Sequence, residues 1–190
     1  MAPGQPLAHF VIAASVLRLT GDFEMTYFED LSDYCYVNST EKAKQRTEKN
    51  VGWLSSGRAF ERLEPSEKFL DSLWSFCTVS VLPTRGLHKC EFCTSEEWFL
   101  AERKGKRLLL GSAEIRVFSE RDVIYAAPNF IYHYVAEHRY RPPDEFVSAA
   151  TQGFRPPTRE YFETLKRSGY EWDNTYSPDA EWDAAAERLR

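Results

Sequence analysis

Residues 108–138, LLLGSAEIRVFSERDVIYAAPNFIYHYVAEH, decide the fold. Apolar and charged side chains alternate over residues 108–118, as in a strand with one face turned to a core. Residues 119–122 form a polar turn, and the apolar segment 123–126 leads back. This stretch therefore predicts an antiparallel β-hairpin.

Prolines indicate where the helices around this hairpin begin. The first turn of a helix accepts proline because the N–H that proline lacks would have no intrahelical partner there. Pro128 predicts a helix that runs to about His138. Ser66 is an N-cap candidate before a stripe of apolar residues, which predicts another helix. Further helices are predicted after Pro142-Pro143, after Pro156-Pro157 and at Ser177-Pro178.

The remaining segments predict shorter elements. Residues 51–54 and 78–82 have the composition of short strands, and the polar segment 38–50 indicates an exposed loop or a short surface helix. Together, the elements predict a single α+β domain with a mostly antiparallel sheet and several helices.

The length of 190 residues suits one domain. We expect an N-terminal extension at residues 1–24, a single α+β domain at 25–169 and an acidic helical tail at 170–190. The tail contains six acidic residues and two arginines, so it carries most of the net charge of −5. It is either a solvated terminal helix or an acidic docking element, and both interpretations stay open.

Charge and hydropathy exclude some classes of function. An acidic chain has no basic excess with which to neutralise phosphates, so we expect no nucleic-acid partner. The apolar stretch 10–17 is too short to span a bilayer, which needs about 20 residues. No lysine or arginine precedes Arg18, as a signal peptide would require. We therefore expect a cytoplasmic protein without membrane contact, with a cleaved export signal as the open alternative.

The cysteines suggest a metal site. Cys90 and Cys93 have the C-x2-C spacing that lets two thiolates bind one metal ion from a tight turn. Cys35 and Cys77 lie in strand-like or apolar surroundings, where inert thiols are expected. Cys90 and Cys93 therefore predict a zinc-knuckle-like turn.

Histidines supply the remaining ligand candidates. His88 lies two residues before Cys90, and His133 and His138 form an H-x4-H pair. On an ideal helix, the two members of that pair point in different directions, at 100° per residue. Either the last turn is distorted and both bind, or one binds and His88 is the fourth ligand. The candidate ligands of a zinc ion, Zn(2+), are thus Cys90, Cys93, His133, His138 and His88.

Four nitrogen and sulfur ligands would complete a tetrahedral site, which is typical of structural zinc. The chain contains no H-E-x-x-H motif, no G-x-S-x-G motif and no phosphate-binding glycine loop. If only three ligands bind, the open position could activate water, with Glu91, Glu114 or Glu137 as the base. Each of these carboxylates is otherwise expected to be a surface charge. A redox dithiol at Cys90 and Cys93 ranks third.

Several motifs also carry a family resemblance. They are YFEDLS (27–32), NVGWL (50–54), RGLHKCEFC (85–93), GSAEIRV (111–117) and APNFIYHYV (127–135), followed by His138, Tyr140, Pro142-Pro143 and Phe146. This set resembles a family of small uncharacterised bacterial proteins and covers about residues 26–150. The resemblance implies that the N-terminal extension and the acidic tail lie outside the shared domain, and it implies no activity.

From these observations we expect a cytoplasmic, non-catalytic bacterial protein that interacts with a protein partner, of the immunity- or defence-accessory type. The alternative is a zinc-dependent hydrolase with an open metal position.

Overall fold

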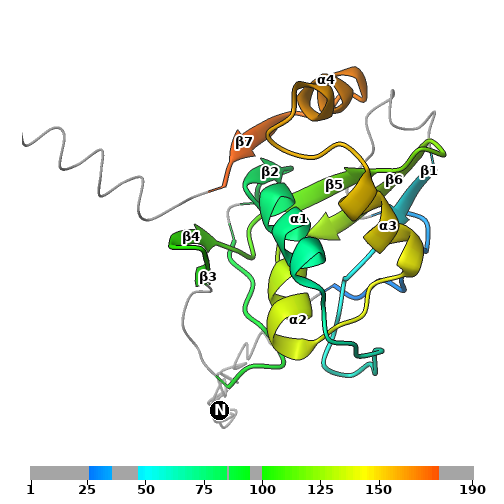
Figure 1. Ribbon diagram of the computed structural model, residues 1–190. Coiled ribbons are helices and arrows are strands. Elements are labelled where there is room, and N and C mark those ends of the chain that lie inside the picture. Colours follow the sequence, from blue (N-terminus) through cyan, green and yellow to red (C-terminus); the bar gives the residue numbers. More distant parts are fainter. Residues whose placement is uncertain (1–25, 36–46, 85, 95–99, 176–190) are drawn as a thin grey trace, which may run out of the picture.

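The computed structural model describes residues 26–35, 47–84, 86–94 and 100–175, which fold into α and β elements (Figure 1). The main sheet has five strands in the order β1-β6-β5-β2-β7, and β3 and β4 pair as a separate hairpin. The strands are β1 (Thr47–Asn50), β2 (Val79–Val81), β3 (Leu100–Arg103), β4 (Lys106–Leu109), β5 (Glu114–Phe118), β6 (Val123–Pro128) and β7 (Trp172–Asn174). The helices are α1 (Glu67–Cys77), α2 (Ile131–His138), α3 (Asp144–Gln152) and α4 (Arg159–Arg167).

The predicted hairpin forms the centre of the sheet. β5 and β6 pair antiparallel, from Glu114 opposite Pro128 to Phe118 opposite Ile124. The first strand of this hairpin is shorter than predicted, because the chain turns at Gly111, where φ is 97°. Residues before this turn belong to β4, which pairs with β3 instead. Glycine suits this position because a left-handed φ costs it little.

The sheet is mixed, with one parallel pair among otherwise antiparallel ones, so the predicted α+β class with a mostly antiparallel sheet is confirmed. The parallel strand is β1, which pairs with β6. The prediction of an exposed loop or helix was wrong for residues 47–50, and the strand predicted at 51–54 is an irregular but buried segment. Residues 47–50 form a strand because they pair with β6, which is distant in the sequence, and the local sequence pattern does not indicate this pairing.

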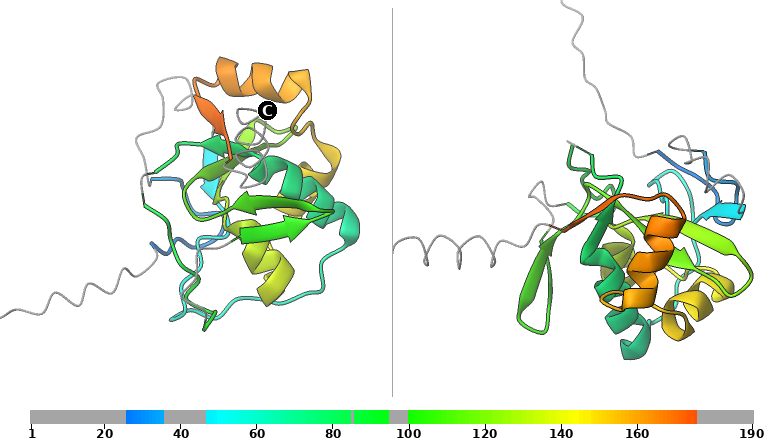
Figure 2. Two further views of the ribbon diagram at one scale, coloured as in Figure 1. Left: turned by 90° about the vertical axis from the view of Figure 1, so that its left-hand side faces the viewer. Right: turned by 90° about the horizontal axis from the view of Figure 1, so that it is seen from above.

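Helices cover one face of the sheet (Figures 1 and 2). α1 lies against β2 and β5, and α3 lies against β5. The Ser66 side chain accepts a hydrogen bond from the N–H of Phe69, as expected for an N-cap. α3 and α4 follow the two proline pairs as predicted, whereas α2 begins at Ile131 because Pro128 is still part of β6. None of the helices in the described ranges is long and apolar enough to cross a bilayer.

The opposite face of β5 is also buried, and it carries charged side chains. Arg116 is fully buried and its Nη1 donates to the Glu114 carboxylate over 2.6 Å. The Tyr34 hydroxyl donates to the same carboxylate over 3.0 Å. The rings of Tyr34 and Tyr170 lie on the Arg116 guanidinium, each with its centroid 4.9 Å from Cζ. The expectation that Glu114 is a surface charge was therefore wrong: alternation reports the two faces of a strand, but not whether the second face is covered.

The C-terminal edge of the sheet lies beyond the predicted domain end at residue 169. β7 pairs with β2 antiparallel, with Ser80 opposite Asp173, and Tyr170 is buried beside Arg116. The predicted extension at 1–24 with its apolar stretch, the polar segment 38–46 and the helix at Ser177 lie outside the described residues.

Replacing Arg116 with leucine should lower the free energy of unfolding by about 3–5 kcal/mol, because Glu114 then stays buried without its cation. Urea unfolding monitored by circular dichroism measures this change. Arg159→Leu is the matched control, because it removes an arginine whose ion pair with Glu163 is exposed and is worth at most about 0.5 kcal/mol. Equal effects of the two substitutions would contradict the importance of the buried pair.

Candidate metal centre

Asn129 holds together the elements that carry the candidate ligands. It is fully buried in the two-residue connection between β6 and α2. Its side-chain oxygen accepts a hydrogen bond from the N–H of Gly111 over 2.8 Å, and its own N–H donates to Ala113. The carbonyl oxygen of Gly111 in turn accepts from the N–H of His88 over 2.9 Å. These hydrogen bonds connect both the start of α2 and the loop that leads to Cys90 to the turn at Gly111.

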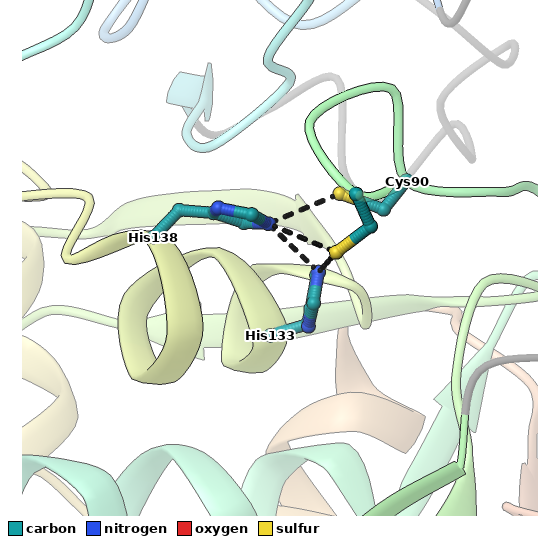
Figure 3. Close-up of side chains that lie close together, drawn as sticks. Cys90, His133 and His138 are labelled. Atoms are coloured by element: carbon teal, nitrogen blue, oxygen red, sulfur yellow. Dashed lines mark hydrogen bonds between the residues drawn. The ribbon is translucent and has the colours of Figure 1, made fainter. Parts of the chain in front are cut away.

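Four of the five candidate ligands come together. Cys90 and Cys93 lie on the loop between β2 and β3, and His133 and His138 lie on α2. One ligand atom from each lies within 4.8 Å of those from the other three. Figure 3 shows the rings of His133 and His138 directed toward the cysteine sulfurs.

The separations are close to those of ligands around one small ion, and the two shortest are slightly below them. The Nε2 atom of His138 lies 3.2 Å from Cys90 Sγ, 3.4 Å from Cys93 Sγ and 3.0 Å from His133 Nε2. The Nε2 atom of His133 lies 3.4 Å from Cys93 Sγ. Metal–ligand bonds of about 2.0–2.3 Å in a tetrahedron place the ligand atoms about 3.3–3.8 Å apart. The four residues therefore fit a tetrahedral metal ion with little rearrangement.

Hydrogen bonding alone does not account for this arrangement. An imidazole nitrogen either donates or accepts one hydrogen bond. Yet His138 Nε2 has three close neighbours, two sulfurs and one nitrogen. A shared metal ion accounts for all three contacts at once, because each atom then directs its lone pair to the same centre.

The end of α2 explains how both histidines reach this centre. The N–H of Arg139 donates to the carbonyl oxygen of Tyr134, five residues back, where an α-helix would use the residue four back. The N–H of Tyr140 bonds to the same oxygen over 3.0 Å. This wide turn, with Arg139 in the left-handed region at φ 58°, closes α2 directly after His138, and both imidazoles reach the same centre. Of the two alternatives left open by the sequence, the structure has the distorted last turn.

Aromatic packing holds the cysteine loop on α2. The ring of Phe92, between the two cysteines, contacts Tyr134 and His138, with centroid distances of 5.8 Å and 5.4 Å. It also contacts Phe60 edge-on at 5.3 Å. Edge-to-face pairs of this kind add about 0.5–1.5 kcal/mol each beyond the burial of their surface. The loop is therefore anchored by a side chain that binds no metal.

Burial sets the protonation of the four residues. It lowers the pKa of His133 to about 3, with His138 adding to the effect, and it also lowers the pKa of His138. Both imidazoles are therefore neutral at neutral pH, which is the form that binds metal. Burial raises the pKa of Cys90 to about 12, and the neighbouring Cys93 acts in the same direction. A divalent cation at this centre would stabilise the thiolates and displace the thiol protons.

The other predicted site residues lie elsewhere. His88 has an exposed side chain and is not part of the four-residue cluster. Glu91 accepts a hydrogen bond from the N–H of Ser56 over 2.7 Å, and Glu137 is exposed. Sequence reasoning did not anticipate the role of Phe92, although an aromatic residue between two cysteines is a visible signal.

A family model described as "Domain of unknown function (DUF7919)" matches residues 26–151. All four clustered residues fall within that range. No curated protein and no solved structure matches the chain.

The geometry assigns different roles to the histidines. We expect His138→Ala to weaken metal binding by more than about 100-fold, since even groups that only support a ligand contribute about 10- to 100-fold. His88→Ala should leave the affinity unchanged. Cobalt(II) titration followed by its visible absorption measures both, because the spectrum also reports tetrahedral sulfur and nitrogen coordination. A loss of the tetrahedral spectrum in His88→Ala would contradict this assignment.

Proposed function

We propose that the chain, which belongs to the DUF7919 family of domains of unknown function, is a zinc-stabilised domain that interacts with a protein partner and does not use the metal for catalysis. The observation that carries this proposal is the convergence of two sulfurs and two nitrogens on one point.

Zinc is the metal that this ligand set favours. Two thiolates and two imidazoles in a tetrahedral arrangement are typical of structural zinc sites, whereas magnesium and calcium prefer oxygen ligands. A closed site of this kind stabilises a fold by cross-linking the segments that supply its ligands. Here the metal would connect the loop between β2 and β3 to α2.

The hydrolase alternative receives less support. A catalytic zinc ion keeps one position open for water, whereas the four residues would fill all four positions. Of the carboxylates proposed as a base, Glu114 is buried in its pair with Arg116. Glu91 is engaged with Ser56 across the surface. Glu114 is therefore not available to activate a water molecule at the metal.

Contacts between the cysteine loop and the segment around residues 55–61 support an interaction role. Phe92 contacts Phe60, and Glu91 accepts from the N–H of Ser56, so the segment around residues 55–61 is fastened to the loop at two points. This segment forms one wall of a surface cleft. The metal would therefore shape a binding surface without touching what binds there.

Removing the metal should lower the thermal stability of the domain. A structural zinc site contributes to folding directly, so chelation or Cys90→Ser should reduce the melting temperature and broaden the amide NMR spectrum around the loop and α2. Calorimetry and zinc analysis on the same samples provide the measurement. Cys35→Ser is the matched control, because Cys35 is an exposed thiol outside the cluster.

Two results would count against the proposal. If purified protein supplied with zinc under reducing conditions binds none, the metal centre is wrong. If chelation leaves the melting temperature unchanged and abolishes a hydrolytic activity, the hydrolase alternative is correct.

A further inference from the structure

A cleft of about 530 Å³ lies beside the metal centre, between residues 27–30, 54–61 and 140–144. Its volume falls in the range of ligand sites, about 300–1,000 Å³. All of its lining residues fall within the range matched by the family model. One wall is the segment fastened to the cysteine loop through Phe60 and Phe92.

Asp30 is the notable charged group in this cleft. One carboxylate oxygen accepts from the N–H of Gly52 over 2.8 Å, and the other accepts from the Tyr140 hydroxyl over 2.6 Å. Burial raises the pKa of Asp30 against the effect of these two hydrogen bonds, and the charge of Glu29 acts in the same direction as burial. Within the described ranges, no cation forms an ion pair with it. Two hydrogen bonds leave a carboxylate with further lone pairs, so Asp30 can accept from a ligand.

Two other acidic residues of the cleft, Glu61 and Asp144, are already paired. Arg141 forms ion pairs with both Glu61 and Asp144, each at 3.2 Å. The remaining arginine of the cleft, Arg58, lies over the ring of Tyr27, with Cζ 5.2 Å from the centroid. Asp30 and Glu29 are thus the carboxylates of the cleft that form no ion pair within the described ranges.

The aromatic walls suit a positively charged ligand. Tyr27, Phe28, Phe60 and Tyr140 line the cleft together with Asp30. Two of these rings already have guanidinium groups on them, since Arg62 lies 5.1 Å from the centroid of Phe60 and Arg58 lies on Tyr27. A cation between aromatic faces and a carboxylate gains from both kinds of attraction.

A second hollow, of about 210 Å³, favours a polypeptide as the source of this cation. It shares Tyr140, Arg141, Pro142 and Asp144 with the first cleft, so the two lie on either side of one strip of chain. Its lining is mainly apolar and includes Leu63, whose side chain is unusually exposed, at 58%. A single segment of protein can place a basic side chain in one hollow and an apolar side chain in the other, which a small amine cannot do.

We propose that the cleft binds a lysine or arginine side chain from a partner protein, with Asp30 as its charged anchor, and that an apolar side chain of the same segment occupies the second hollow. This assignment rests on the interaction role proposed above, but the residues that carry it are not metal ligands.

The experiment is an NMR titration of the ¹⁵N-labelled, zinc-supplied protein with a capped peptide of alternating lysine and leucine residues. We expect saturable shifts at the amides of Gly52 and of residues 54–61 and 140–144. Asp30→Asn should weaken binding by about tenfold or more, because it removes the anchoring charge and keeps the side-chain shape. Glu61→Gln removes an acidic residue from the same cleft and should change the affinity less than about twofold, because Glu61 is already paired.

Each comparison has an outcome that overturns the proposal. Equal affinities of Asp30→Asn and the unchanged protein would remove Asp30 as the anchor. A peptide with glutamate in place of lysine that binds as well would remove the charge preference. Spermidine that binds as tightly as the peptide would show that a small amine, and not a protein segment, is the ligand.

Zinc analysis on the same samples separates this proposal from the one on the metal. A zinc-free protein that stays folded and binds the peptide would contradict structural zinc and support the cleft. A zinc-loaded protein that does not bind the peptide would support the metal and overturn the cleft.

Discussion

The hydrogen bonds of Asn129 constrain the rest of the structure. This buried residue joins β6 to α2 and binds both Gly111 and Ala113 before β5 begins. The Cys77 thiol at the end of α1 also donates to its carbonyl oxygen over 3.4 Å. A buried amide that lost these partners would cost about 1–3 kcal/mol for each unsatisfied group, so the connection has little freedom. The position of α2, and with it the histidines, follows from this one junction.

The candidate metal centre and the cleft are two consequences of that placement. α2 presents two imidazoles to the cysteine loop, and its widened end leads directly into Tyr140, whose hydroxyl holds Asp30. The loop in turn holds Phe60 through Phe92. The four clustered residues, the loop and the cleft wall therefore form one continuous set of contacts, through which a metal ion bound at the cluster would influence the surface.

Two acidic residues that are withdrawn from water, Glu114 fully and Asp30 partly, are stabilised in different ways. Glu114 is compensated within the chain by Arg116, whose guanidinium is covered by two tyrosine rings. Among the residues that the structure describes, Asp30 receives hydrogen bonds but no ion pair. A charge that is fully paired inside a domain contributes to its structure, whereas a partly desolvated charge at a cleft is available to a ligand.

The sequence alone determined most of the local elements and a set of five candidate ligands. The Ser66 cap, the proline pairs before α3 and α4, and the alternation in β5 are encoded within a few residues, because capping and strand geometry act locally. The chemistry of Cys90, Cys93, His133 and His138 was equally visible, since C-x2-C and H-x4-H spacings limit how far apart the ligands can lie.

Only the tertiary structure decided what depends on distant segments. It placed β1 beside β6, covered the charged side of β5 with Tyr34 and Tyr170, and left His88 outside the cluster. It also showed the widened end of α2, which an ideal helix of 100° per residue does not predict. In each case the reason is the same: the outcome is set by packing between residues far apart in the chain, and local spacing carries no information about it.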